Sequence, residues 1–94
     1  MKTVHLDLSE CKFIGEMHHR IRVAFNFPEW YGENWDAFWD LLRSECEAEY
    51  LRVSGVGEAS EDIRKELLIM ENVLNRYKAN CGRYGENFDF SIEE

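Results

Sequence analysis

The stretch FPEWYGENWDAFWD, from Phe27 to Asp40, carries the strongest local signals for the fold of this chain. Pro28 predicts that a preceding helix has ended, because the residue before a proline is pushed out of helical geometry. Asn34 suits the N-cap of a second helix that runs to Arg43 or a little beyond, since its side chain can accept a free amide hydrogen. The stretch contains three tryptophans, a tyrosine, two phenylalanines and four acids, and no base. Core segments are rarely so acidic, and solvated faces are rarely so aromatic.

On the N-terminal side, the pattern predicts a strand followed by a helix. Residues 2–8 alternate between polar and apolar side chains, which is typical of a strand with one covered face. From about Gly15 the spacing becomes helical, with Met17, Ile21 and Phe25 in one stripe. Gly15 is a candidate for the cap of this helix.

On the C-terminal side, residues 49–54 alternate again and predict a second strand, and the glycines of residues 54–60 predict a loop. Ser60 suits the N-cap of a long helix that is predicted to end just before Gly82. Its apolar stripe follows a spacing of three or four residues: Ile63, Leu67, Met70, Leu74 and Tyr77. Residues 87–92 predict the last strand.

The predicted order is β-α-α-β-α-β, which makes the chain an α/β protein. Strands separated by helices pair in parallel through right-handed crossovers. Because all three strands alternate, only one face of the sheet is expected to be covered. We therefore expect a three-stranded parallel sheet with the helices mainly on one face, in a single small domain spanning residues 1–94.

Charge and cysteine usage limit the partners and the compartment. The net charge is −8 and the pI is about 4.8, so phosphate-rich partners are repelled and direct nucleic-acid binding is not expected. A basic protein partner fits this charge, and so does a simple role in solubility. No signal peptide or membrane-spanning run is apparent. Three cysteines, Cys11, Cys46 and Cys81, cannot all pair within one chain, which favours free thiols in the cytoplasm.

Few residues suggest catalysis or metal binding. His18 and His19 are adjacent and diverge by about 100° on a helix, so they cannot chelate one ion together. His18 falls near the apolar stripe and is expected to be a core-edge residue. The sequence has no pair of cysteines at the spacing of a metal site, and it has no glycine-rich phosphate loop. We expect no metal, no cofactor and no catalytic residue; a small enzyme that uses a free cysteine is the alternative.

The second predicted helix has two distinct faces. One arc is apolar and is expected to face the core: Trp35, Phe38, Leu41 and Leu42. Asp36 and Asp40 lie on the opposite face, one turn apart, and Trp39 stands at the border. This edge is either a solvated acidic face or an acidic-aromatic surface for a cationic cleft, extended by Trp30 and Tyr31. Arg43 is placed to relieve the repulsion between the two aspartates.

The run PEWYGENWDAFWDLL, from Pro28 to Leu42, resembles the barstar family of proteins that inhibit barnase-type ribonucleases. The resemblance implies that the second helix and the loop before it fill the active site of the ribonuclease. At the matching positions, Asp40 takes the place of a substrate phosphate and Asp36 accompanies it. Trp39, Trp30 and Gly32 belong to the same contact surface.

Two departures from the family limit this transfer. The last long helix of the family carries a further acidic contact residue, and the simplest alignment places Arg76 there, so no role passes to it. The family's short helix after the second strand has no clear counterpart. The leading hypothesis is an inhibitor of a basic ribonuclease that is monomeric when free. The alternative is a regulatory or immunity-type module that binds a different protein through the same helix.

Overall fold

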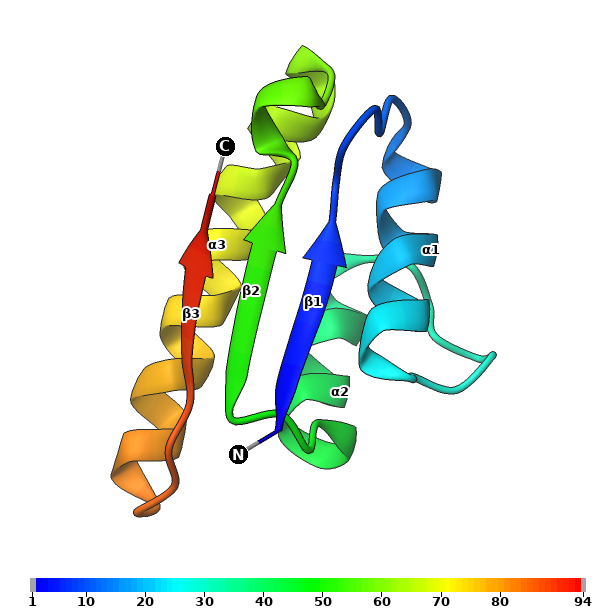
Figure 1. Ribbon diagram of the computed structural model, residues 1–94. Helices are drawn as coiled ribbons and strands as arrows, with labels where there is room; N and C mark the ends of the chain where they lie inside the picture. Colours follow the sequence, from blue (N-terminus) through cyan, green and yellow to red (C-terminus); the bar gives the residue numbers. More distant parts are fainter. Residues whose placement is uncertain (1, 94) are drawn as a thin grey trace.

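A computed structural model describes residues 2–93, and its elements follow the predicted order. In chain order they are β1 (Thr3–Asp7), α1 (Ile14–Phe25), α2 (Trp35–Glu45), β2 (Tyr50–Ser54), the 3-10 turn η1 (Val56–Glu58), α3 (Glu61–Arg83) and β3 (Asp89–Ile92). Figure 1 shows the three strands side by side in front of the helices, with α1 beside β1 and with α2 and α3 behind the sheet. The predicted α/β class and element order are confirmed.

The sheet is parallel throughout, in the order β1-β2-β3. Leu6 pairs with Val53, and Val53 pairs with Ile92, so apolar side chains form rows across the face that the helices cover. Leu6 and Val53 are fully buried there. Because β2 lies in the centre, both crossover connections carry their helices to the same face.

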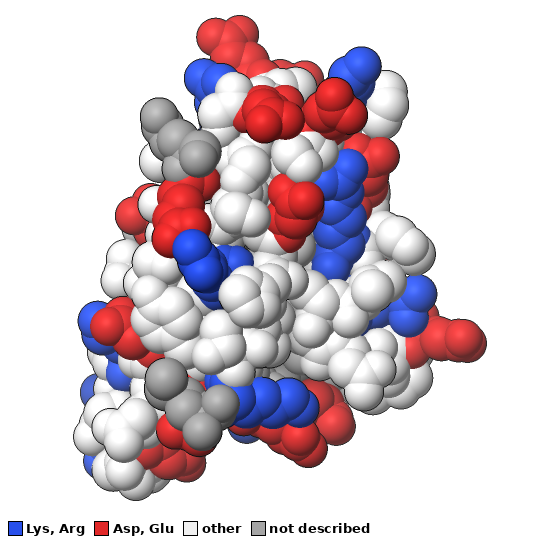
Figure 2. All heavy atoms as spheres, viewed as in Figure 1, with Lys and Arg blue, Asp and Glu red and all other residues white. Residues whose placement is uncertain are grey.

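The opposite face of the sheet is open to solvent, as its alternation predicts. His5 and Arg52 are paired neighbours on this face and both are exposed. Acidic and basic side chains are interspersed over it in Figure 2, and the Arg52 guanidinium bonds the Glu93 carboxylate at 3.0 Å. Exposed pairs of this kind contribute only about 0–1 kcal/mol each. This face therefore contributes little to the stability of the core.

Both predicted helical stripes lie in the core. Met17, Ile21 and Phe25 of α1 are buried, and so are the predicted stripe residues of α3. The Ser60 hydroxyl accepts a hydrogen bond from the Ile63 amide, which confirms the predicted cap of α3.

Two predictions about glycines were wrong. Gly15 does not cap α1, which begins at Ile14 and has no side-chain cap. Gly82 does not follow α3 but lies within it, on an exposed turn where a missing side chain leaves no hole in the core. The helix ends instead where Gly85 takes a left-handed φ of 75° and the Glu86 amide donates to the Cys81 carbonyl at 2.8 Å.

The predicted loop at residues 54–60 contains the short turn η1, which Gly55 starts in a left-handed conformation. Within residues 2–93, no helix has the length and apolar character needed to cross a bilayer.

Candidate protein-binding site

The loop of residues 26–34 is held against the first turn of α2 by one side chain. The Asn34 Oδ1 accepts a hydrogen bond from the Ala37 amide at 2.8 Å, which confirms the predicted N-cap. Its Nδ2 donates to the Gly32 carbonyl at 3.1 Å. Asn34 therefore starts the helix and fixes the loop at the same time.

Gly32 lies close to the first turn of α2. A Cβ atom added at Gly32 would stand 3.2 Å from Nδ2 of Asn34 and 3.3 Å from Cβ of Ala37. Both contacts are tight, so a larger residue would push against the cap. The lack of a side chain allows the loop to lie directly on the helix.

Trp30 and Tyr31 point in opposite directions, which corrects one expectation. Trp30 is 71% exposed, but Tyr31 is only 5% exposed and does not extend the surface. The Tyr31 hydroxyl is hydrogen bonded to Nδ1 of His18 at 2.7 Å, and burial raises the pKa of Tyr31. His18 is buried more deeply than a core-edge residue, and burial lowers its pKa. A buried hydroxyl and a buried ring nitrogen each require a partner, which explains why Tyr31 turns inward.

The core side of α2 follows the prediction closely. Phe38, Leu41 and Leu42 are buried, and Trp35 is half-buried with its ring against Phe38 at 5.5 Å. The indole Nε1 of Trp35 donates to the Glu66 carboxylate on α3 at 2.8 Å. This bond ties the start of α2 to α3 and fixes the direction of the acidic face.

The two predicted aspartates are exposed on the other side of α2. The Asp40 Oδ1 accepts a hydrogen bond from Nη2 of Arg43 at 2.8 Å, so Arg43 offsets part of the negative charge as expected. The side chain of Asp40 nevertheless remains 69% exposed. Its carboxylate is therefore available to a partner.

Trp39 is half-buried, as its border position on α2 predicts. Its contacts with two arginines were not predicted. The guanidinium of Arg43 lies 4.9 Å from the centre of the Trp39 ring, and that of Arg76, on α3, lies 4.5 Å from it. Such contacts attract the positive charge to the aromatic face. The arginines hold the indole in one orientation.

Three of the five predicted contact residues line one groove. Trp30, Gly32 and Asp40 surround a volume of about 280 Å³, together with Ala37, Leu41 and Ser44. Trp39 lines a second hollow, of about 270 Å³, with Arg76 and Arg83. Asp36 is exposed one turn before Asp40 and lines neither. We call Trp30, Gly32, Asp36, Trp39 and Asp40 together the acidic-aromatic surface.

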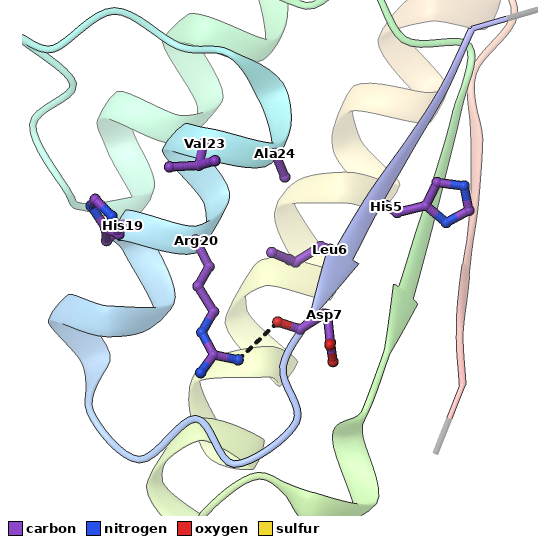
Figure 3. Close-up of a pocket in the computed structure, with 7 residues that line it drawn as sticks. All are labelled: His5, Leu6, Asp7, His19, Arg20, Val23 and Ala24. Atoms are coloured by element: carbon purple, nitrogen blue, oxygen red, sulfur yellow. Dashed lines mark hydrogen bonds between the residues drawn. The ribbon is translucent and has the colours of Figure 1, made fainter.

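A separate groove of about 350 Å³ lies between β1 and α1 and has a different chemistry. Figure 3 shows His5 pointing away from α1, so it does not approach His19. The Arg20 guanidinium there donates to the carbonyls of Asp7 at 3.0 Å and Ser9 at 2.9 Å. Arg20 is thus used to hold the β1–α1 connection. Among residues 2–93, no three His, Cys, Asp or Glu side chains come together in a metal-binding arrangement.

The cysteines have the surroundings of structural residues. Cys11 and Cys81 are buried and Cys46 is half-buried, and all three are free. Burial raises the pKa of the Cys11 and Cys46 thiols, which disfavours the reactive thiolate. These two cysteines lack the activation that a thiol enzyme requires.

Three parallel strands, helices on one face and an acidic-aromatic edge on the second helix define the class of small α/β proteins with the barstar fold. The family model for Barstar, described as barnase inhibitor, matches residues 1–93, and the chain belongs to this family. Members of the family bind barnase-like ribonucleases and are inhibitors rather than enzymes. The resemblance first apparent between Pro28 and Leu42 thus extends over essentially the whole chain.

Proposed function

We propose that this protein inhibits a small basic ribonuclease by inserting the acidic-aromatic surface into the active-site cleft of the enzyme. The observation that carries the proposal is the groove in which an exposed aromatic residue, Trp30, and an exposed carboxylate, Asp40, lie together. An aromatic ring and an anion are the two features that a ribonuclease recognises in RNA, as base and as phosphate. The surface therefore resembles a fragment of the substrate.

Asp40 is the residue proposed to take the place of the phosphate. A cleft that binds phosphate is lined by cationic side chains, and these attract a carboxylate that replaces it. Asp36 adds a second carboxylate one turn earlier on the same exposed face of α2. The net charge of −8 directs the approach of a basic enzyme from a distance.

The surface needs little ordering before it binds. Asp40 stands between the buried residues Phe38 and Leu41 on α2, and Asn34 fixes the loop that presents Trp30. Because the backbone is already ordered, less conformational entropy is lost on association. The exposed Arg43 can be displaced from Asp40 by the cations of the cleft at small cost.

The same proposal covers the organisation of the protein. The chain acts as a single domain, as a monomer when free and as a binding protein without catalytic activity, in the cytoplasm of the cell that makes the ribonuclease. One buried hydrophobic cluster has side chains from all three helices and from β1 and β2, and Phe90 and Ile92 of β3 pack against it, which supports a single domain. Three free cysteines support a reducing compartment.

Inhibition of a barnase-type ribonuclease, compared between wild type and Asp40→Ala, tests the proposal. A desolvated charged anchor is expected to contribute at least about 2 kcal/mol, which is roughly a thirtyfold loss of affinity. Asp62→Ala removes the same charge from the exposed first turn of α3 and is the matched control. A loss below about threefold for Asp40→Ala would remove Asp40 from this role. Higher salt should slow association, since steering between exposed charges is screened.

A further inference from the structure

A pair of arginines lies beside Trp39 at the edge of the acidic-aromatic surface. Arg76 and Arg83, which we call the arginine rim, line the hollow next to Trp39 together with Ala79 and Asn80. The two arginines are seven positions apart on α3, so they lie on the same face of the helix about 10 Å apart along its axis. A chain with an excess of acids thus places two cations next to a residue of its proposed contact surface.

Among residues 2–93, no acidic side chain forms a salt bridge with either arginine of the rim. Both arginines are exposed. The negative end of the α3 dipole accounts for a base at Arg83, in the last turn. It does not account for Arg76, since this effect fades within one turn of the helix end. Arg76 presents an unpaired charge toward any partner that covers Trp39.

We infer that Arg76 of the arginine rim determines which ribonuclease this protein binds, by requiring a carboxylate at the edge of the cationic cleft. The inference rests on the proposed function, in which Asp36 and Asp40 enter that cleft. The partner would then have a cationic cleft for the two aspartates and an acidic residue beside it for Arg76. The complementary surface is divided in sign, not uniformly basic.

The physical reason is that a uniformly basic partner would meet Arg76 at close range. Juxtaposed like charges at an interface cost several kcal/mol, which is enough to reject a partner of otherwise suitable shape. A carboxylate at the same place would instead pair with a planar guanidinium whose position is already fixed by its contact with Trp39. Arg76 would thereby select one ribonuclease and exclude others that have the same active site.

Arg76 also supports the Trp39 ring, so a simple loss of affinity on mutation does not distinguish the two roles. The distinguishing property is dependence on the charge of the partner, which a purely supporting residue would not show. The probe is a barnase-type ribonuclease in which residues around the mouth of the cleft are changed one at a time to Glu and to Lys. Dissociation constants are measured for the wild-type protein, Arg76→Glu, Lys12→Glu and Asp40→Ala.

At one rim position of the probe, the wild-type protein should bind the Glu form at least about tenfold more tightly than the Lys form. Arg76→Glu should reverse this preference. Lys12→Glu makes the same change in net charge on the exposed β1–α1 loop and should leave the preference as in wild type.

Binding that needs Asp40 but shows no rim position coupled to Arg76 overturns the inference and leaves the proposed function intact. No binding to any form of the probe, by wild type or by Arg76→Glu, rejects both. Binding by Arg76→Glu alone supports the inference, because it shows that Arg76 excludes this ribonuclease.

Discussion

Replacing Tyr31 with phenylalanine removes a single hydroxyl from the buried side of the loop that presents Trp30 and Gly32. The ring of Tyr31 packs on Phe27 at 5.6 Å and would keep that contact. The change deletes the 2.7 Å hydrogen bond to Nδ1 of His18 and leaves that nitrogen buried without a partner. No other buried side-chain nitrogen or oxygen among residues 2–93 lacks a hydrogen bond, so the defect would be new.

The magnitude follows from these two losses. A neutral hydrogen bond contributes about 1 kcal/mol net, and a buried polar atom left unpaired costs about 1–3 kcal/mol. Tyr31→Phe should therefore lower the free energy of unfolding by about 2 kcal/mol. For a domain of this size, that lowers the Tm by about 8–16 °C.

Urea unfolding followed by tryptophan fluorescence measures the effect, and an unchanged dependence on urea shows that the same surface is buried. Tyr84→Phe is the matched control, because Tyr84 is 70% exposed and should change the free energy of unfolding by less than about 0.5 kcal/mol. If the two variants have the same stability, the reasoning that the His18–Tyr31 bond fixes the loop is refuted.

Three further predictions concern stability. Burial lowers the pKa of folded His18 from its ordinary 6.5, and the nearby Glu33 and Glu66 oppose this only partly. The unfolded chain therefore takes up a proton at higher pH than the folded chain, so the contribution of His18 is complete above pH 6.5 and falls as the pH decreases, by at most about 1.4 kcal/mol per pH unit. Chemical unfolding between pH 7 and 5 should show that the free energy of unfolding falls less for His18→Gln than for wild type or for the exposed His19→Gln. Equal declines in the three proteins would contradict this role of His18. Gly55→Ala should destabilise by more than about 2 kcal/mol, because φ is +73° and the new Cβ would stand 2.4 Å from the Ser9 amide nitrogen. A Cβ atom added at Gly15 would meet nothing within 4 Å, so Gly15→Ala should stabilise α1 by about 0.5–1 kcal/mol. Thermal unfolding should therefore give a lower Tm for Gly55→Ala and a higher Tm for Gly15→Ala, and Tm changes of the same sign would contradict this reasoning.

The order of elements could be predicted because each strand and helix has one buried face, and that face has a period visible in the sequence. The same periodicity correctly predicted that Phe38 is buried and Asp40 exposed on α2. It failed for two glycines at the predicted helix ends, since Gly15 and Gly82 lie inside helices and do not cap them. A glycine permits a left-handed conformation, but its presence in the sequence does not show that the backbone adopts one.

Contacts between distant segments could not be predicted, and they decide the details of the site. The sequence around Trp30 and Tyr31 does not show which of the two side chains is buried. Tyr31 is buried because its hydroxyl is hydrogen bonded to His18 on α1. Arg76 was recognised only as a departure from the family, because its contact with Trp39 depends on how α3 packs on α2. One such contact could have been predicted. Glu66 follows the buried Ile63 by three residues, and an acid on the apolar face of a helix indicates a hydrogen-bond donor nearby, here Trp35 Nε1.

The parallel order of the sheet also determines when the binding surface can form during folding. Thr3 pairs with Tyr50 and Tyr50 pairs with Asp89, so every strand pairing closes a long loop, and no hairpin can form early. Such distant pairings fold more slowly than local ones. The aspartates lie in the first crossover and Arg76 in the second. The contact between Arg76 and Trp39 therefore joins two segments that close separately, and the full charge pattern exists only after α3 has packed on α2.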